Sequence, residues 1–136
     1  MTVRQIDKPT PTAVSAAEYL GCEVGAIASS LVFLADGEPI LVVTSGAHRV
    51  NTTALAGRIG VQAITRATPD DVRAATGQVI GGVAPVGHPA PVRTYLDVAL
   101  RDHDEVWAAA GIPASLFAIG YADLLRVTGA TEVEVD

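Results

Sequence analysis

The stretch that decides the fold is 30–45, SLVFLADGEPILVVTS, which predicts a β-hairpin. Two runs rich in Val, Leu and Ile flank Asp36-Gly37, and Asp-Gly is a favoured pair for a two-residue hairpin turn. Both runs are almost continuously apolar, which indicates strands that are covered on both faces. The centre of the fold is therefore predicted to be a buried hairpin with strands over 30–35 and 39–45.

Short helices and strands are expected on either side of this hairpin. Thr68-Pro69-Asp70-Asp71 is typical of a helix start, with a capping hydroxyl, proline at the first position and acids in the first turn. The elements do not alternate strictly as βαβ, so the predicted class is α+β with a mixed or antiparallel sheet curled around one core. Helices are predicted over 13–20, 52–57, 69–76 and 121–127, and further strands over 3–6, 61–64, 94–100, 106–110, 115–119 and 132–135.

Length and composition predict one domain over 1–136. Charged residues make up 18% of the chain against a usual share of about 25%, so apolar patches compatible with a homodimer are expected at the surface. No apolar run reaches the roughly 18 residues of a membrane span, and the first residues lack a secretory signal. With one cysteine, Cys22, the chain cannot form an internal disulfide. We expect a cytoplasmic protein with no membrane partner.

The charge balance limits the nucleic-acid partners. Nine Lys and Arg face fifteen Asp and Glu, for a net charge of −6, and no basic run occurs. Proteins that coat nucleic-acid backbones neutralise phosphates with Lys and Arg. DNA binding is therefore not expected, whereas contact with a single RNA end stays open.

The side chains offer little metal or nucleophile chemistry. His48, His88 and His103 have no partners at the spacing of metal ligands, and no CxxC occurs, so no metal and no cofactor are expected. Cys22 follows a predicted helix, which is the wrong end for lowering a thiol pKa. A GxSxG nucleophile motif is absent.

The loop 79–91, VIGGVAPVGHPAP, is the strongest candidate for a site. The Gly81-Gly82 pair lets a ligand approach the main chain, and Pro85 stiffens the far side. Between them, the amides of Gly82, Val83 and Ala84 could point into one cavity, as the rigid donors of an oxyanion hole do. The alternative is a tight structural turn between a helix and a strand.

Three segments, in order, carry a resemblance that covers nearly the whole chain. They are 10–51, TPTAVSAAEYLGCEVGAIASSLVFLADGEPILVVTSGAHRVN; 76–88, TGQVIGGVAPVGH; and 104–130, DEVWAAAGIPASLFAIGYADLLRVTGA. Together they resemble the YbaK/EbsC family, also called the prolyl-tRNA synthetase-associated editing domain. Gly81 and Pro85 stand in the positions of that family's GxxxP loop.

The resemblance implies a mixed, barrel-like sheet flanked by short helices. It also implies hydrolysis of the ester that joins a mismatched amino acid to the 3′ end of a tRNA. In such enzymes the GxxxP loop holds the ester carbonyl through backbone amides, and the terminal ribose helps to activate water. The expected catalytic segment is Gly81, Gly82, Val83, Ala84 and Pro85, and the expected partner is the 3′ end of an aminoacyl-tRNA.

Substrate-binding positions follow from the same resemblance, with two departures. Ser29 stands where editing members usually carry a lysine, and Ala109 stands where many carry a serine. Asp123 matches an acidic position near the pocket, with a solvated residue in a first helical turn as the alternative. Ser30 is expected to line the wall, and His48 and His88 are expected to make polar contacts. The alternative for His48 is a surface-loop histidine with no role in the site.

These departures leave two functional hypotheses from different classes. The first is an aminoacyl-tRNA deacylase that works in trans and relies on backbone amides and on its substrate. The second is a catalytically silent binding module that kept the pocket and lost the lysine, because a neutral serine gives weaker contacts than a charged donor. A structural subunit that acts through an apolar dimer surface is a third.

Overall fold

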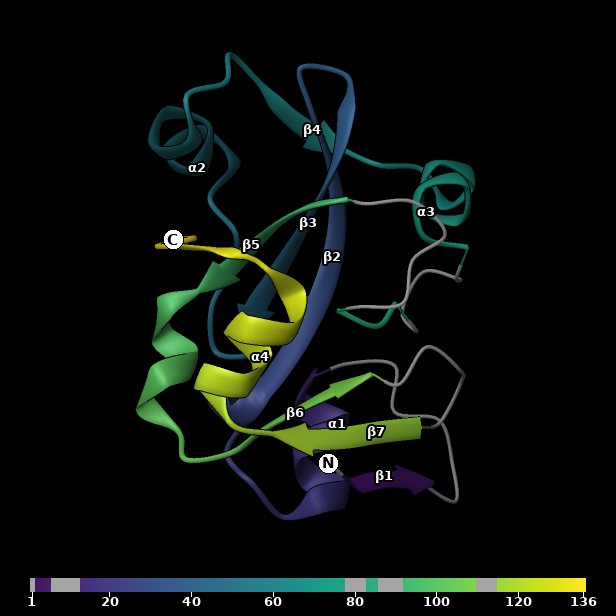
Figure 1. Ribbon diagram of the computed structural model, residues 1–136, viewed down its shortest axis with the longest axis vertical. Coiled ribbons are helices and arrows are strands. Elements are labelled where there is room, and N and C mark those ends of the chain that lie inside the picture. The colour runs from purple at the N-terminus through teal and green to yellow at the C-terminus, as the bar shows by residue number, and fades with distance from the viewer. Residues whose placement is uncertain (1, 6–12, 78–82, 86–91, 110–114) are drawn as a thin grey trace.

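The computed structural model describes residues 2–5, 13–77, 83–85, 92–109 and 115–136 (Figure 1). Within these ranges an eight-stranded sheet is flanked by four α-helices and two short 3-10 helices. The strands are β1 (Thr2–Gln5), β2 (Ile27–Ala35), β3 (Glu38–Ser45), β4 (Ile64–Arg66), β5 (Arg93–Asp97), β6 (Val106–Ala109), β7 (Ser115–Ile119) and β8 (Thr131–Val133). The helices are α1 (Ala13–Leu20), η1 (Val24–Ala26), α2 (Thr52–Ile59), α3 (Pro69–Thr76), η2 (Val98–Asp102) and α4 (Tyr121–Thr128).

The predicted hairpin is confirmed at the centre of the sheet. β2 and β3 pair antiparallel from Ala35↔Glu38 to Ala28↔Ser45. Asp36 and Gly37 both have positive φ, 50° and 85°, as a tight two-residue turn between twisted strands requires. β2 begins at Ile27, three residues before the predicted start, so the hairpin is longer than the apolar run alone indicates.

The strand order is β1-β7-β6-β2-β3-β5-β8, and β4 pairs with β2 outside this path. The pairs β2–β6, β3–β5 and β5–β8 are parallel and the others are antiparallel, so the sheet is mixed. Figure 1 shows β4 beside the upper end of β2, and β6, β7 and β1 beside its lower end. The predicted class, α+β with a mixed sheet flanked by short helices, is confirmed.

β3 is buried on both faces and divides the core. Leu41 packs in one cluster with Val72 of α3 and Leu124 of α4. Val42 points to the opposite face and packs in a second cluster with Leu55 of α2. A strand covered on both sides can be continuously apolar, which explains the sequence of β3. The expectation that both strands are covered on both faces is wrong for β2, where Leu31 is 40% exposed.

The four α-helices in the described ranges are eight residues long each. About 20 apolar residues are needed to cross a bilayer, so none of these helices could span one. α2 runs past the predicted end at Gly57 and ends where Gly60 takes the left-handed conformation, with φ 78°.

The strand predicted over 61–64 is wrong in position, because β4 covers Ile64–Arg66. The carboxylate of Asp36 at the hairpin turn accepts hydrogen bonds from the amides of Gln62 and Ala63, at 2.9 to 3.1 Å. The Asp36 amide donates in turn to the Ala63 carbonyl at 2.9 Å. These bonds hold 62–63 against the turn, and pairing with β2 therefore starts at Ile64.

Candidate active site in a cleft beside strand β2

A cleft of about 730 Å³ lies along β2. On one side β2 is paired throughout with β3. On the other side it pairs with β6 through Ile27 and Ala28 and with β4 through Phe33, Leu34 and Ala35. Among the described strands, the middle of β2 therefore has a neighbour on one side only, and the cleft follows this interruption. Its volume is within the roughly 300–1,000 Å³ typical of small-molecule sites.

The cleft brings together five of the residues predicted from the sequence, namely Ser29, Ser30, His48, Val83 and Ala109. Gly81, Gly82 and His88 lie outside the described residues. Ala84 and Pro85 are buried directly after Val83 but are not among the lining residues. The remaining described lining residues are Ala13, Ala16, Ile27, Ala28, Leu31, Val32, Phe33, Arg49, Val50, Thr52, Ile64, Arg66, Ala67, Val72, Trp107 and Leu116.

The two serines of β2 present their hydroxyls on opposite faces, because successive side chains of a strand alternate. Ser29 lies opposite Thr44 of β3, and Ser30 lies opposite Val43. The Oγ of Ser30 is buried and has no hydrogen-bond partner among the described residues. Buried polar atoms are almost always bonded, so this hydroxyl is a donor and acceptor that a ligand or a water could satisfy.

Asp97 at the end of β5 organises the polar end of the cleft. Its side chain is 1% exposed. Its Oδ2 accepts hydrogen bonds from Thr44 Oγ1 at 3.2 Å, from the Ser45 amide at 3.0 Å and from His48 Nδ1 at 3.1 Å. Its Oδ1 accepts from the Ala99 amide at 3.0 Å, which starts the 3-10 turn and ends the strand predicted over 94–100 early. Burying a charged carboxylate is costly, and the four hydrogen bonds to Asp97 offset that cost.

His48 is held in place by this carboxylate. A carboxylate oxygen accepts only, so Nδ1 of His48 carries the proton that it donates to Asp97. Nε2 lies 3.6 Å from Asp136 Oδ2, beyond hydrogen-bond length. With both ring nitrogens near carboxylates, His48 is suited to a fixed polar contact in the cleft wall.

The predicted catalytic loop is anchored by helix α3. Thr68 and Asp71 form a capping box at its start, with bonds of 3.1 and 2.9 Å, and Gly77 ends it with φ 72°. Val83 is 3% exposed and packs in the cluster that contains Val72 of α3. The described end of the loop is thus fixed to the core where it meets the cleft.

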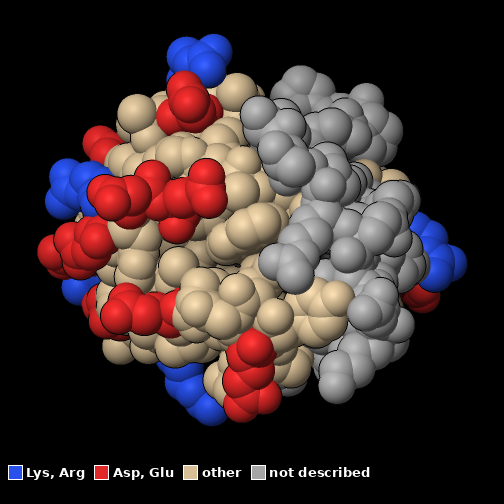
Figure 2. All heavy atoms as spheres, turned by 90° about the horizontal axis from the view of Figure 1, so that it is seen from below, with Lys and Arg blue, Asp and Glu red and all other residues tan. Residues whose placement is uncertain are grey.

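The cleft is cationic in an acidic protein. Among its described lining residues are Arg49, Arg66 and His48, but no aspartate or glutamate. Neither Arg49 nor Arg66 forms an ion pair within the described ranges. Figure 2 shows acidic side chains gathered on the face seen from below. The carboxylates that give the net charge of −6 are thus kept out of the described cleft wall.

Asp123 lies apart from the other predicted residues. It borders a second hollow of about 390 Å³, the α4 hollow, with Glu105, Gly120 and Arg126. Its Oδ1 accepts a hydrogen bond from Arg126 Nη2 at 3.0 Å. Both side chains are more than half exposed, and α4 holds them three residues apart. The structure therefore gives Asp123 a helix-surface ion pair.

The described residues contain no cluster of three or more His, Cys, Asp or Glu side chains that could hold a metal ion. Cys22 packs against the buried cluster of Ala16, Ala17 and Ile27, and burial raises the pKa of its thiol. A raised pKa keeps the thiol protonated, so Cys22 is unsuited to be a nucleophile.

Four residues of the site were missed by the sequence reasoning: Asp97, Arg49, Arg66 and Phe33. Asp97 carried one usable signal, an acidic residue within an otherwise apolar predicted strand. Arg49 follows His48 directly and could have been grouped with it. Arg66 and Phe33 reach the cleft through the β2–β4 pairing, which joins segments about 30 residues apart and has no local signal.

The fold is that of an aminoacyl-tRNA editing domain. Residues 7–127 match this family, and the chain therefore belongs to the YbaK-type aminoacyl-tRNA editing domain family, which confirms the resemblance seen in the sequence.

Individual relatives agree with this assignment. The chain is 33% identical over 96 residues to a proline–tRNA ligase of Nitratidesulfovibrio vulgaris, covering 68% of this chain and 17% of the ligase. It is 33% identical over 110 residues to the uncharacterized protein YwhH of Bacillus subtilis, covering 80% of this chain and 69% of YwhH. A crystal structure described as a candidate trans-editing enzyme for prolyl-tRNA synthetase superposes with a TM-score of 0.92 at 40% identity, covering 99% of this chain and 85% of that one.

Proposed function

We propose that this protein is an aminoacyl-tRNA deacylase that hydrolyses the ester of a mischarged tRNA in trans. The observation that carries the proposal is the cleft itself. It brings Ser29, Ser30, His48, Val83 and Ala109 from separate elements to one hollow that has no carboxylate in its described wall. Such a hollow suits the uncharged ester and the anionic RNA end that a deacylase must take in.

In the proposed reaction, water attacks the ester carbonyl and the terminal ribose oxygen leaves. The amides of Gly82 and Val83 would stabilise the charge that develops on the carbonyl oxygen. Ala84, the third predicted donor, is buried outside the cleft lining and already has an interaction of its own. Asp97 accepts the Nδ1 proton of His48, which fixes the orientation of the ring and leaves Nε2 as an acceptor for a hydroxyl or a water in the cleft. The ribose of the substrate would then assist the attacking water, as the resemblance implies.

The partner in this proposal is the 3′ end of an aminoacyl-tRNA, with no DNA, metal or cofactor. An acidic protein gains little long-range attraction for tRNA, so we expect weak binding or delivery by a carrier such as a synthetase. A cytoplasmic location and a homodimer remain expectations, and light scattering tests the dimer.

The second candidate function is a silent binding module of the same fold. It is favoured by Ser29, which places a neutral hydroxyl where editing members carry a lysine. Ala109, at the family's serine position, also lines the cleft without a polar group. A module of this kind would bind the acylated RNA end and leave the ester intact.

Hydrolysis of a panel of alanyl-, cysteinyl- and seryl-tRNAs tests the proposal. Gly82→Val should abolish deacylation, because a branched Cβ fills the space left for the carbonyl. The matched control is Gly57→Val at an exposed position of α2, where an added Cβ meets nothing within 4 Å. Full activity of Gly82→Val contradicts the role of the loop.

Substitution at Ser29 separates the two candidate functions. If the native chain is inactive on the whole panel and Ser29→Lys gains deacylation, the silent module is correct. If the native chain is active and Gly82→Val is not, the deacylase is correct.

A further inference from the structure

We propose that Phe33 and Arg66 form a nucleotide subsite at the β4 end of the cleft. Phe33 would stack on the terminal base of the RNA, and Arg66 would bind the phosphodiester that precedes it. The inference rests on the proposed function, because it assumes that an acylated RNA end enters the cleft.

The sheet register places the two side chains together. Phe33 of β2 and Arg66 of β4 are direct partners in the antiparallel pair. Directly opposed residues project from the same face, with Cβ atoms about 4.5–5.5 Å apart. Both residues line the cleft. An aromatic ring and a guanidinium therefore stand side by side on one wall.

Their burial suits the two roles. Phe33 is half-buried, because it packs against the cluster that contains Ile40 and Tyr95 and also lines the cleft. A ring fixed by packing is a preorganised platform for a base. Arg66 is exposed and forms no ion pair among the described residues, so its charge is available to a phosphate.

The length of the cleft fits one terminal nucleotide. Ser29 and Phe33 lie four residues apart on β2, which corresponds to about 13 Å. Ala109 lies at the other end, where β6 pairs with the first residues of β2. The acyl group would then lie near Ser29 and Ala109, and the base near Phe33.

A stacked base beside a cation is how proteins hold single-stranded nucleic acid without reading its sequence. Every base has a face that can stack on an aromatic ring, so the subsite would bind the RNA end without selecting the identity of its terminal base. This combination also suits an acidic protein, because it needs one phosphate contact rather than a basic surface.

Binding measurements with two non-hydrolysable probes test the subsite. The first probe is an RNA minihelix with alanine joined to its 3′ end through an amide. The second is the corresponding 3′-alanylamido adenosine, which has no phosphate. The variants are Arg66→Gln and Phe33→Leu, and the control is Arg73→Gln on an exposed position of α3 outside the cleft lining.

Arg66→Gln should weaken minihelix binding about tenfold and lower the slope of log K against log salt by about 0.7, as expected for one lost phosphate contact on a single strand. It should leave binding of the adenosine probe unchanged. Phe33→Leu should weaken both probes about tenfold, because both carry the base. Arg73→Gln should match the wild type with both.

The subsite is wrong if Arg66→Gln binds the minihelix with wild-type affinity and salt slope, and equally wrong if the native chain binds neither probe. Arg66 is exposed, so this variant stays informative even if Phe33→Leu loosens the core. Native binding of the minihelix without hydrolysis of alanyl-tRNA would overturn the deacylase and leave the subsite standing. Hydrolysis of alanyl-tRNA by the native chain, with no effect of either variant on binding, would support the deacylase and overturn the subsite.

Discussion

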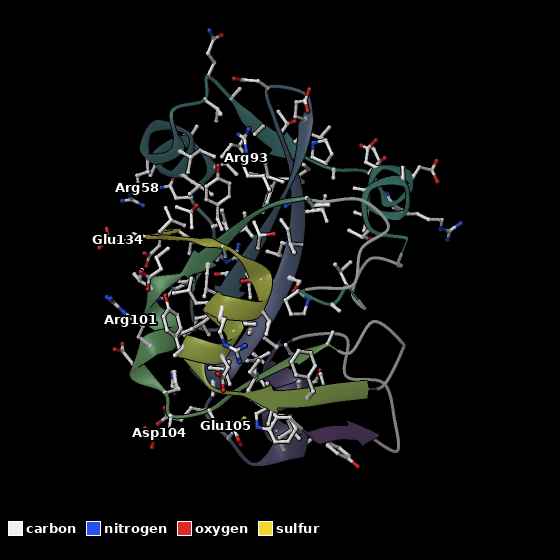
Figure 3. All side chains as sticks on the ribbon, in the orientation of Figure 1. Arg58, Arg93, Arg101, Asp104, Glu105 and Glu134 are labelled. Atoms are coloured by element: carbon white, nitrogen blue, oxygen red, sulfur yellow. The ribbon has the colours of Figure 1, made fainter. Side chains whose placement is uncertain are left out.

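The cleft beside β2 and the α4 hollow differ in the state of their polar groups. In the α4 hollow the cation of Arg126 is already paired with Asp123 at 3.0 Å, and Glu105 adds a further carboxylate. Figure 3 shows Glu105 and Asp104 together at the start of β6. In the cleft, Arg66 has no described ion pair and the Ser30 hydroxyl has no described partner. Both features are concave, so the cleft is distinguished from the α4 hollow by polar groups that have no described partner and are available to a ligand.

The carboxylate that holds His48 behind the cleft wall and the carboxylate on the rim of the α4 hollow also differ in their surroundings. Asp97 is buried and accepts four hydrogen bonds from the end of β3, from His48 and from η2. Asp123 is exposed on a helix and has a single arginine partner. Substitution of Asp97 should therefore destabilise the protein far more than substitution of Asp123.

The largest expected effect comes from exchanging these two carboxylates for amides. Asp97→Asn should lower the free energy of unfolding by about 3 kcal/mol, because an amide cannot accept from all four donors and leaves buried groups unpaired. Asp123→Asn should change it by about 0.5 kcal/mol or less, since an exposed ion pair contributes little. Urea titrations of both variants measure the difference, and equal losses would erase the distinction.

Glycine substitutions probe the packing at the base of the cleft. A Cβ on Gly46 would stand 2.5 Å from the Val24 carbonyl oxygen and 2.7 Å from the Cβ of Ala13 in the cleft wall. Gly46→Ala should therefore destabilise the protein by about 2 kcal/mol.

The matched control for Gly46 is Gly57→Ala in α2, where a Cβ meets nothing within 4 Å. This variant should raise stability by about 0.5–1 kcal/mol, because alanine is a better helix former than glycine. Thermal melting of both variants gives the comparison. A melting temperature of Gly46→Ala equal to that of the wild type would contradict the predicted clash with Val24 and Ala13.

Ser30→Ala should sharpen the contrast, because it removes the unmet hydroxyl. The free protein should gain about 1 kcal/mol of stability, since a buried unpaired group is lost. Binding of the acylated minihelix should weaken at the same time if the ligand satisfies that hydroxyl. Calorimetry on the same samples measures both, and a loss of stability would show that the hydroxyl already has a partner.

The smallest effect concerns Tyr121 at the start of α4. Burial and the 2.6 Å hydrogen bond to Glu132 raise the pKa of its phenol well above the ordinary value. The folded state thus holds this proton more tightly than the unfolded chain. Its stabilisation is complete below about pH 10 and falls as the pH rises further.

Tyr121→Phe should therefore remove part of the alkaline loss of stability while costing about 1 kcal/mol at pH 7. Urea titrations of wild type and variant between pH 8 and pH 11 check this. Parallel curves across that range would mean that the phenol does not contribute.

Local signals made much of the fold predictable. The Asp36-Gly37 turn, the cap at Thr68 and the end of α3 at Gly77 each depend on a few neighbouring residues, and the structure has them as predicted. Gly57 is the exception, because α2 continues to Gly60. His48 could be named from its place after the predicted hairpin, and Ser29 and Ser30 could be named from the family resemblance; all three line the cleft.

Longer-range features could not be predicted in this way. The hub at Asp97 depends on β3 and β5 lying parallel, with Val43 opposite Leu96. The pairing of Phe33 with Arg66 depends on a three-residue strand whose start is set by the Asp36 carboxylate. The residues adjacent in sequence to Asp97, Phe33 and Arg66 do not indicate these strand pairings, which are known only from the assembled sheet.

The clamp between Asp36 and the residues before β4 makes the hairpin tip and β4 a single mechanical unit. Since β4 carries Arg66, a change of the Asp36-Gly37 turn should shift the position of Arg66 in the cleft wall. Lengthening or stiffening the Asp36-Gly37 turn should therefore alter the width of the cleft at Arg66 without changing any residue of the cleft lining.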